Sequence, residues 1–139
     1  MKVRDILIQK GIITDIKAKI SAPRNTQVIA HSNMHISQGW IDIGCFNGEP
    51  GYEHQEDLRS LKDAGANGGY VSLAPFPTSQ PCLDTKSQVE AIRARNNDHA
   101  VQILPIANLT KGGNGKEIAE ILDLWNAGCL LYTSPSPRD

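Results

Sequence analysis

Short apolar runs and amphipathic stretches alternate from Trp40 onward, and this alternation restricts the possible folds more than any other feature. The apolar runs predict strands and the amphipathic stretches predict helices. In chain order these are a strand over 40–46, a helix over 56–64, a strand over 70–74, a helix over 86–95, a strand over 101–106 and a helix over 116–125. Strands that alternate with helices form right-handed βαβ units on a parallel sheet. The predicted fold class is therefore α/β.

The predicted helices carry signals for their ends and faces. Thr85 or Asp84 can cap the helix over 86–95, because both side chains accept hydrogen bonds from free backbone N–H groups. Gly65 and then the Gly68-Gly69 pair are expected to close the helix over 56–64. The helix over 116–125 has apolar residues at the spacing i, i+3, i+4, i+7, which predicts its buried face. These residues are Ile118, Ile121, Leu122 and Trp125.

Residues 1–38 precede the alternation and predict a small, partial β module. Its expected strands are 5–9, 12–16, 28–30 and 34–36. Lys10-Gly11 separates the first two strands, and a glycine-containing pair between β-branched runs is typical of a hairpin. We therefore expect an antiparallel module ahead of the parallel sheet.

The composition is that of an ordinary globular chain. Of its 139 residues, 40% are hydrophobic and 21% are charged, and the formal net charge is −1. This charge gives no basic surface for nucleic acid and no electrostatic attraction to a membrane. No apolar run reaches the ~20 residues that a membrane span needs, and the polar N-terminus does not resemble a secretory signal. We expect a cytoplasmic protein with neither nucleic-acid nor membrane partners.

The first strand of the alternation leads into an acidic turn, Glu49-Pro50-Gly51. The whole segment from Gly39 to Gly51 resembles the first metal-binding motif of the cyclic amidohydrolases, above all the dihydroorotases. That motif has the form Gly-x-Ile-Asp-x-His-x-His-x-Arg-Glu-Pro-Gly. Residues 74–81 are similar to the family's Met-Pro-Asn-Thr-x-Pro loop, and residues 104–112 are similar to its Ala-Leu-Thr-Lys-Gly segment.

The resemblance covers residues 4–128, and its three segments occur in the family's order. It implies the N-terminal part of a (β/α)8 TIM-type amidohydrolase barrel. Residues 1–38 would be the family's small β module, and residues 39–128 would supply the first three βα units. About five further units would then lie beyond Gly128.

The resemblance also implies that the ligand positions of the motif are empty. Gly44 and Phe46 stand at the two zinc-binding histidines, and zinc needs nitrogen, sulfur or oxygen donors that neither side chain has. Gly48 stands at the position of the arginine that grips the substrate carboxylate, and Thr78 stands where the family often has a substrate-binding asparagine. Glycine cannot replace the planar guanidinium fork with which arginine binds a carboxylate.

Other motif positions keep the family's residues. They are Asp42, Glu49, Pro50 and Gly51. A structural role is expected for Asp42, with its carboxylate accepting backbone N–H groups. Cys45 is expected to face away from the barrel interior, because side chains alternate along a strand. We expect no metal, cofactor or catalytic residue within this chain, although active members of the family hold zinc.

The family reaction is the reversible hydrolysis of dihydroorotate to carbamoyl aspartate in pyrimidine biosynthesis. The remaining catalytic residues are expected beyond Gly128, so this chain alone is expected to be inactive. Two alternatives follow for the longer protein. The favoured one is a non-catalytic homologue, a pseudoenzyme retained as a partner of aspartate carbamoyltransferase or for self-association. The other is an active metal-dependent cyclic amidohydrolase with a rearranged site on other strands.

Residues 129–139 resemble one reading frame of an adapter used in sequencing libraries. They are therefore expected to be a non-native tail, and such segments are excluded from fold reasoning. The alternative is a native strand over 129–134 with a proline-rich polar end.

The histidines and a glycine-rich segment are not expected to form sites. The four histidines are expected on the surface or in solvated loops: His31, His35, His54 and His99. The glycine-rich segment 112–116 precedes a predicted helix, so its N–H groups could bind an anion. It lacks the P-loop spacing, and a flexible loop is the favoured interpretation.

Overall fold

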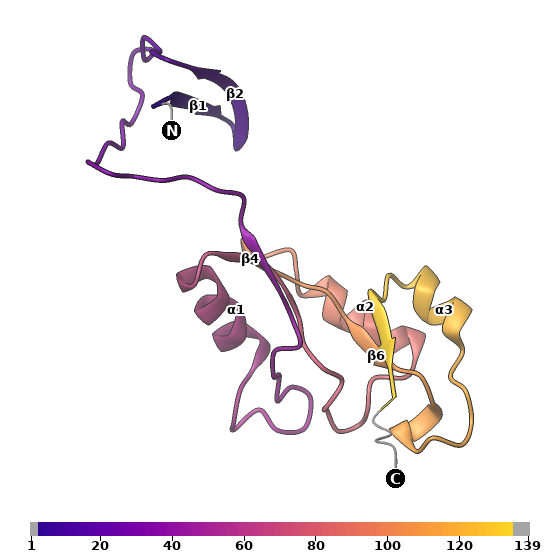
Figure 1. Cartoon of the computed structure of the whole chain (residues 1–139). Helices are drawn as coiled ribbons and strands as arrows, with labels where there is room; N and C mark the ends of the chain where they lie inside the picture. The colour runs from indigo at the N-terminus through magenta and orange to yellow at the C-terminus, as the bar shows by residue number, and fades with distance from the viewer. Residues whose placement is uncertain (1–2, 135–139) are drawn as a thin grey trace. The chain divides into compact units, whose positions relative to one another are not determined.

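The computed structural model describes residues 3–134. The chain divides into two compact units, residues 1–37 and 38–139, and each is described by itself (Figure 1). Among residues 3–134, none of the helices has the length and apolar character required to cross a bilayer.

The N-terminal unit is built on one antiparallel hairpin, drawn in indigo in Figure 1. Its strands are β1 (Asp5–Gln9) and β2 (Ile12–Lys17). Lys10 and Gly11 connect them with φ angles of 51° and 76°. Two successive positive φ angles give the tight turn whose twist matches that of the flanking strands. The predicted hairpin is confirmed.

The strands predicted over 28–30 and 34–36 are wrong, because residues 18–39 form neither helix nor strand. Val28 and Ile29 are 72% and 67% exposed. Apolar alternation favours a strand only where a neighbouring strand pairs with it and packs against one face. Residues 28–36 have no such neighbour in this unit.

The C-terminal unit contains the parallel strands that the alternation predicts. β3 (Trp40–Ile43), β4 (Tyr70–Ala74) and β5 (Gln102–Ile103) form a sheet in that order. β6 (Ile106–Asn108) pairs in parallel with β7 (Leu131–Thr133). The α/β class is confirmed. The described residues contain three open sheets rather than a closed barrel, so the TIM-type architecture remains a proposal.

The strand predicted over 101–106 is divided at Pro105. β5 pairs with β4, whereas β6 pairs with β7. Proline has no N–H group for a strand ladder, so it stands where one pairing ends and another begins. Its carbonyl is nevertheless used, because it accepts a hydrogen bond of 2.8 Å from the backbone N–H of Leu130.

Helix α1 (Leu58–Asn67) begins and ends later than predicted. Asp57 caps it, since its carboxylate accepts a 2.7 Å hydrogen bond from the Ser60 backbone N–H. Gly65 does not end the helix but lies buried within it, where a Cβ would come 2.8 Å from Leu73 Cδ1. The glycine is therefore used for close helix–strand packing, and the helix ends at Gly68.

Helix α2 (Lys86–Ala94) confirms the prediction for this segment, with Thr85 at its N-cap. Gln88 completes the cap, because its side-chain oxygen accepts a 3.0 Å hydrogen bond from the Thr85 backbone N–H. A short 3₁₀ turn, η1 (Lys111–Gly113), and helix α3 (Ile121–Asn126) follow.

The helix predicted over 116–125 is wrong in its extent and in its buried face. Ile118, Leu122 and Trp125 are 67%, 72% and 64% exposed, whereas Leu124 is fully buried. The segment before α3 is extended instead of helical, because Ala119 N–H donates to the Leu109 carbonyl at 2.9 Å. Pairing with the strand region shortens the helix and turns a different side toward the core.

Two apolar clusters form the core of the C-terminal unit. The first lies beneath α1 and comprises Leu58, Leu61, Leu73, Val101 and Ile103. The second lies beneath α2 and α3 and comprises Leu83, Val89, Ala107, Ala119, Leu124, Ala127 and Cys129. Together the two clusters pack the helices against the strands. The loops after β3 and β4 lie at the carboxyl ends of these strands.

Part of the segment expected to be a non-native tail belongs to this unit. Cys129 is buried, and residues 131–133 form β7. This matches the alternative of a strand at that place. It does not test the origin of the segment, because an apolar run of any origin can pair with an open edge. The non-native tail stays a prediction, and residues 135–139 lie outside the described part of the chain.

Candidate functional site

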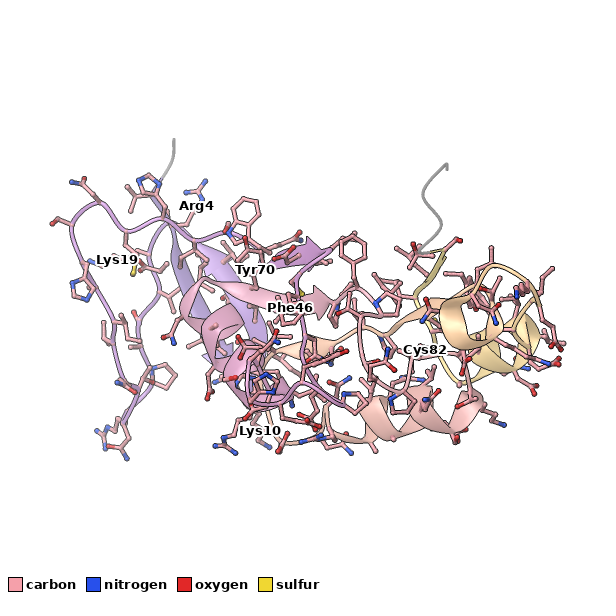
Figure 2. All side chains as sticks on the ribbon, turned by 90° about the horizontal axis from the view of Figure 1, so that it is seen from below. Arg4, Lys10, Lys19, Phe46, Tyr70 and Cys82 are labelled. Carbon is pink, nitrogen blue, oxygen red and sulfur yellow. The ribbon has the colours of Figure 1, made fainter. Side chains whose placement is uncertain are left out.

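The candidate site is formed by the loops that follow β3, β4 and β6. The carboxyl ends of parallel strands are where α/β proteins place their functional residues. Of the residues singled out in the sequence, Gly44, Phe46 and Gly48 lie in the loop after β3, and Thr78 lies in the loop after β4. Phe46 and Cys82 are labelled in Figure 2.

Gly44 is held between two backbone hydrogen bonds that join the β3 and β4 segments. Gly44 N–H donates to the Ala74 carbonyl at 2.9 Å, and Phe76 N–H donates to the Cys45 carbonyl at 3.0 Å. The φ angle of Gly44 is 107°, a backbone conformation that L side chains rarely adopt. A Cβ at this position would lie 2.9 Å from Cε2 of the Phe76 ring.

Phe46 and Gly48 occupy different surroundings. Phe46 is 48% exposed, so its ring is presented at the surface of the unit. Gly48 is buried in a tight turn in which Tyr52 N–H donates to its carbonyl at 2.6 Å. A Cβ on Gly48 would overlap the Tyr52 carbonyl oxygen and lie 2.7 Å from the Glu56 carbonyl oxygen.

These surroundings do not fit a zinc ion. Glycine and phenylalanine offer no donor atom for zinc. Among residues 3–134 there is also no group of three or more His, Cys, Asp or Glu side chains placed to hold a metal. The Gly44 and Phe46 side chains therefore offer no atom that could bind a metal.

Thr78 is exposed, and its hydroxyl donates to the Asn47 carbonyl at 3.4 Å. Asn47 is itself 5% exposed and fastens the loop, because its amide group bonds both the N–H and the carbonyl of Glu49. Asn108, at the end of β6, donates to the Pro77 carbonyl at 3.4 Å. The polar side chains of the three loops thus bond to backbone groups and hold the loops to one another.

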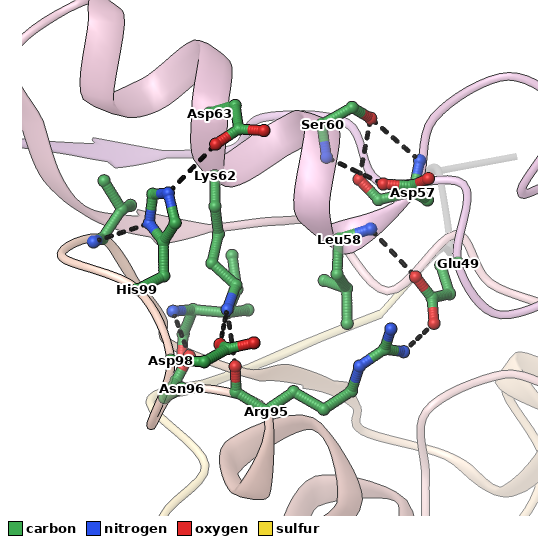
Figure 3. Close-up of polar contacts among 12 residues, drawn as sticks. Glu49, Asp57, Leu58, Ser60, Lys62, Asp63, Arg95, Asn96, Asp98 and His99 are labelled. Carbon is green, nitrogen blue, oxygen red and sulfur yellow. Dashed lines mark hydrogen bonds and ion pairs between the residues drawn. The ribbon is translucent and has the colours of Figure 1, made fainter.

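Glu49 has a structural role that the sequence did not indicate. One carboxylate oxygen accepts a 2.9 Å hydrogen bond from the Leu58 N–H in the first turn of α1, and the other forms an ion pair with Arg95 just after α2 (Figure 3). The Glu49 side chain is 14% exposed. A carboxylate at a helix N-terminus satisfies free N–H groups and interacts favourably with the helix dipole.

Pro50 and Gly51 connect the same loop to the loop after β4. Gln80 N–H donates to the Pro50 carbonyl at 2.9 Å. Gly51 has a φ angle of 104°, and a Cβ there would lie 2.9 Å from Gln80 Cβ. The retained Glu-Pro-Gly turn is therefore a packing contact between the loop after β3 and the loop after β4.

Asp42 and Cys45 lie close enough to influence each other. Cys45 packs against the cluster beneath α1. Its orientation relative to a barrel interior stays a prediction, because the described residues form open sheets. Burial, together with the negative charge of Asp42, raises the pKa of the Cys45 thiol to about 11. Such a thiol is protonated at neutral pH and is a poor nucleophile. The backbone hydrogen bonds expected for the Asp42 carboxylate are not found among residues 3–134.

The histidines are divided between the two units. His31 and His35 are exposed in the N-terminal unit, and His54 is exposed beside Tyr52 with the ring centroids 6.4 Å apart. His99 is less exposed than predicted, because Val101 N–H donates to its Nδ1 at 3.0 Å and its Nε2 lies 3.2 Å from Asp63.

The glycine-rich segment is not open to an anion. Gly112 N–H donates to the Asp84 carboxylate at 2.6 Å, and Gly115 N–H donates to the Thr110 hydroxyl at 3.0 Å. No helix begins directly after the segment, since α3 starts at Ile121. The alternative of an anion site at this segment is therefore wrong.

Burial and, to a lesser extent, the charge of Asp84 raise the pKa of the neighbouring Cys82 thiol.

The sequence analysis did not identify Lys62, a buried cation on α1 that contacts the end of α2. Its ammonium group donates to the Arg95 carbonyl at 2.5 Å and to Asp98 at 3.2 Å (Figure 3). This contact lowers the pKa of the exposed Asp98 carboxyl, chiefly through the hydrogen bond and then through the charge. Lys62 thereby connects α1 to the end of α2.

The Asp57 cap of α1 gives a pH-dependent prediction. The hydrogen bond from the Ser60 N–H favours the carboxylate and lowers the pKa of Asp57. Its stabilising contribution is therefore present above the unfolded-state pKa of about 4 and is lost as the pH falls through the lower, folded-state pKa. In Asp57→Asn, which keeps a capping oxygen but does not titrate, the free energy of unfolding should fall less between about pH 5 and about pH 3. Urea unfolding at both pH values measures this, and equal losses in the two proteins would contradict it.

The parallel strands, the crossover helices and the loops at the carboxyl ends define an α/β protein whose candidate site lies at one edge of its sheet. A family model described as dihydro-orotase-like matches residues 34–136. This match covers most of the chain, and the chain belongs to the dihydroorotase-like family.

Individual relatives agree with this family. The dihydroorotase of Citrifermentans bemidjiense is 33% identical over 130 residues, which are 93% of this chain and 31% of that protein. The dihydroorotase of Ruminiclostridium cellulolyticum is 35% identical over 133 residues, which are 95% of this chain and 31% of that protein. The dihydroorotase of Geobacter sulfurreducens is 32% identical over 133 residues, with 31% of its length covered. The chain thus spans about a third of the length of these curated relatives.

Proposed function

We propose that this chain is the N-terminal part of a longer dihydroorotase homologue, called the parent protein below, that has kept the amidohydrolase scaffold and lost its catalysis. In this proposal residues 39–128 supply the first three βα units of a TIM-type barrel. One observation carries it. By the resemblance of residues 39–51 to the family motif, Gly44, Phe46 and Gly48 stand at the positions of the two zinc-binding histidines and the substrate-binding arginine, and their side chains have no ligand atoms.

The roles of the retained residues support the proposal. Glu49 bonds the first turn of α1 and pairs with Arg95, and Gly51 packs closely against Gln80. These contacts are needed for the fold whether or not the protein is an enzyme. The part of the motif that remains is therefore the part that joins two βα units, and the part that is gone is the part that would touch metal and substrate.

The relatives are named dihydroorotases, and the reaction that the parent has lost in this proposal is the reversible hydrolysis of dihydroorotate to carbamoyl aspartate. Zinc, where an active relative binds it, activates water for that hydrolysis. The parent would act in the cytoplasm as a structural partner, through aspartate carbamoyltransferase or through self-association. A scaffold role explains why the fold persists without the site.

The test is made on the purified parent protein. We expect no turnover of dihydroorotate above the blank and less than stoichiometric zinc by elemental analysis. The dihydroorotase of Geobacter sulfurreducens, assayed side by side, is the positive control. Turnover of dihydroorotate together with stoichiometric zinc would establish the alternative, an active amidohydrolase with a rearranged site on other strands.

A further inference from the structure

We propose that Gly44 and Phe76 form a packed pair in which the Phe76 ring opposes a side chain at position 44, so that restoring the two histidines does not by itself rebuild a metal site. This inference deepens the proposed function and rests on it. It concerns the Phe76 ring that packs beside Gly44, in addition to the absence of ligand atoms at position 44.

Backbone hydrogen bonds hold the segments that carry Gly44 and Phe76 next to each other. Hydrogen bonds of 2.9 Å (Gly44 N–H to Ala74) and 3.0 Å (Phe76 N–H to Cys45) lie on either side of the pair. The two segments can therefore not move apart without breaking the junction between β3 and β4.

The space beside Gly44 is occupied by this ring. A Cβ on Gly44 would lie 2.9 Å and 3.0 Å from Cε2 and Cζ of Phe76, closer than carbon atoms pack. The φ angle of 107° is a second, separate obstacle, because L residues avoid this conformation. Removing the ring should therefore relieve the first obstacle and leave the second.

Phe46 provides a matched control within the same loop region. Its exposed fraction is 48%, against 49% for Phe76, so the two rings are presented to solvent to the same degree. The Phe46 ring is not among the three nearest atoms to the Gly44 Cβ position, whereas all three belong to Phe76. Truncating Phe46 should leave the effect of a Gly44 substitution unchanged.

The experiment is a double-mutant cycle on unfolding of the parent protein, with Gly44→Ala, Phe76→Ala and both together. We expect Gly44→Ala to lower the folded-to-unfolded ratio at least tenfold, and we expect Phe76→Ala to reduce that loss at least fivefold. The same cycle with Phe46→Ala should show coupling of less than twofold. Equal losses from Gly44→Ala with and without the Phe76 ring would overturn the pair.

A folding failure is also informative in this design. If Gly44→Ala yields no folded protein, recovery of folded protein by Phe76→Ala but not by Phe46→Ala supports the pair. Recovery by neither substitution overturns it.

Zinc affinity provides a second readout. Gly44→His with Phe46→His is compared with the triple variant that adds Phe76→Ala, in competition with a chromogenic chelator. At least tenfold tighter Zn²⁺ binding by the triple variant is expected, and equal affinity would overturn exclusion by the ring. Neither readout depends on turnover, so a parent that hydrolyses dihydroorotate would overturn the proposed function without deciding the fate of this pair.

Discussion

Replacing Gly48 by alanine should lower the free energy of unfolding of the parent protein by about 3 kcal/mol, because the added methyl group has no space. Its Cβ would overlap the Tyr52 carbonyl oxygen and would lie 2.7 Å from the Glu56 carbonyl oxygen. Both neighbours are backbone atoms in a turn closed by the 2.6 Å hydrogen bond from Tyr52 N–H to Gly48. Backbone cannot rotate away as a side chain can, so the turn itself must open.

Gly48→Arg, which restores the family's arginine, should cost about as much as Gly48→Ala, because the first added atom causes the clash. Gly68→Ala is the control. Gly68 has a φ angle of −82°, and its Cβ position faces the Tyr70 ring at 3.0 Å, a side chain that can shift. It should lose no more than about 1 kcal/mol. Chemical unfolding of the three variants measures the difference, and a harmless Gly48→Ala would show that the turn is not closed in this way.

This expectation bears on the proposed loss of an arginine at position 48. An arginine at position 48 requires a different path for residues 48–56, so its loss and the tight turn belong together. If the proposal is right, a single substitution at position 48 cannot restore a substrate contact. The same conclusion holds at Gly44, where the ring of Phe76 and the φ angle both oppose a side chain.

Local signals in the sequence were sufficient for part of the fold. The Lys10-Gly11 pair defined the hairpin, and Thr85 defined the start of α2. Positive φ and side-chain capping depend on the residue and its immediate neighbours, so such features can be predicted from short segments. The parallel strands followed from the alternation of apolar runs with amphipathic stretches.

Predictions failed where distant segments decide the structure. The helix over 116–125 was shortened by the pairing of Ala119 with Leu109, which no pattern within the segment reveals. The strands at 28–30 and 34–36 lacked a partner within their unit. In each case the local propensity was overridden by the presence or absence of tertiary contacts.

The packing of the candidate site could not be predicted from the sequence. The empty ligand positions at Gly44, Phe46 and Gly48 follow from the family resemblance and stay a prediction. The ring against Gly44 and the carbonyl groups around Gly48 come from loops that approach only in the folded chain. Sequence order alone does not contain these distances.

The burial of Lys62 could have been predicted, because its position in the sequence fits the buried face of α1. Leu58, Leu61, Lys62 and Gly65 follow the i, i+3, i+4, i+7 spacing of a buried helix face, and all four are buried. A lysine in that phase must either extend its ammonium group to solvent or find an acceptor. The side chain is 5% exposed and finds the Arg95 carbonyl.

Replacing Lys62 by methionine should therefore lower the free energy of unfolding of the parent protein by about 1–3 kcal/mol. The change removes the ammonium donor and leaves the Arg95 carbonyl without that partner. Lys62→Ala should lose more, because it also removes the buried methylene groups. Asp98→Asn is the control for the ion pair. The Asp98 side chain is 73% exposed, so its substitution should leave stability at neutral pH unchanged within error.

Urea unfolding of the three Lys62 and Asp98 variants at neutral pH separates these contributions. The expected order of destabilisation is alanine at 62, then methionine at 62, then asparagine at 98. A methionine variant as stable as the unsubstituted protein would show that the Arg95 carbonyl does not need the ammonium group, as happens where an apolar residue replaces a buried charge without loss. A loss in Asp98→Asn equal to that in Lys62→Met would assign the effect to the ion pair instead. The expected order assigns the connection between α1 and the end of α2 to the hydrogen bond with the backbone, not to the surface ion pair.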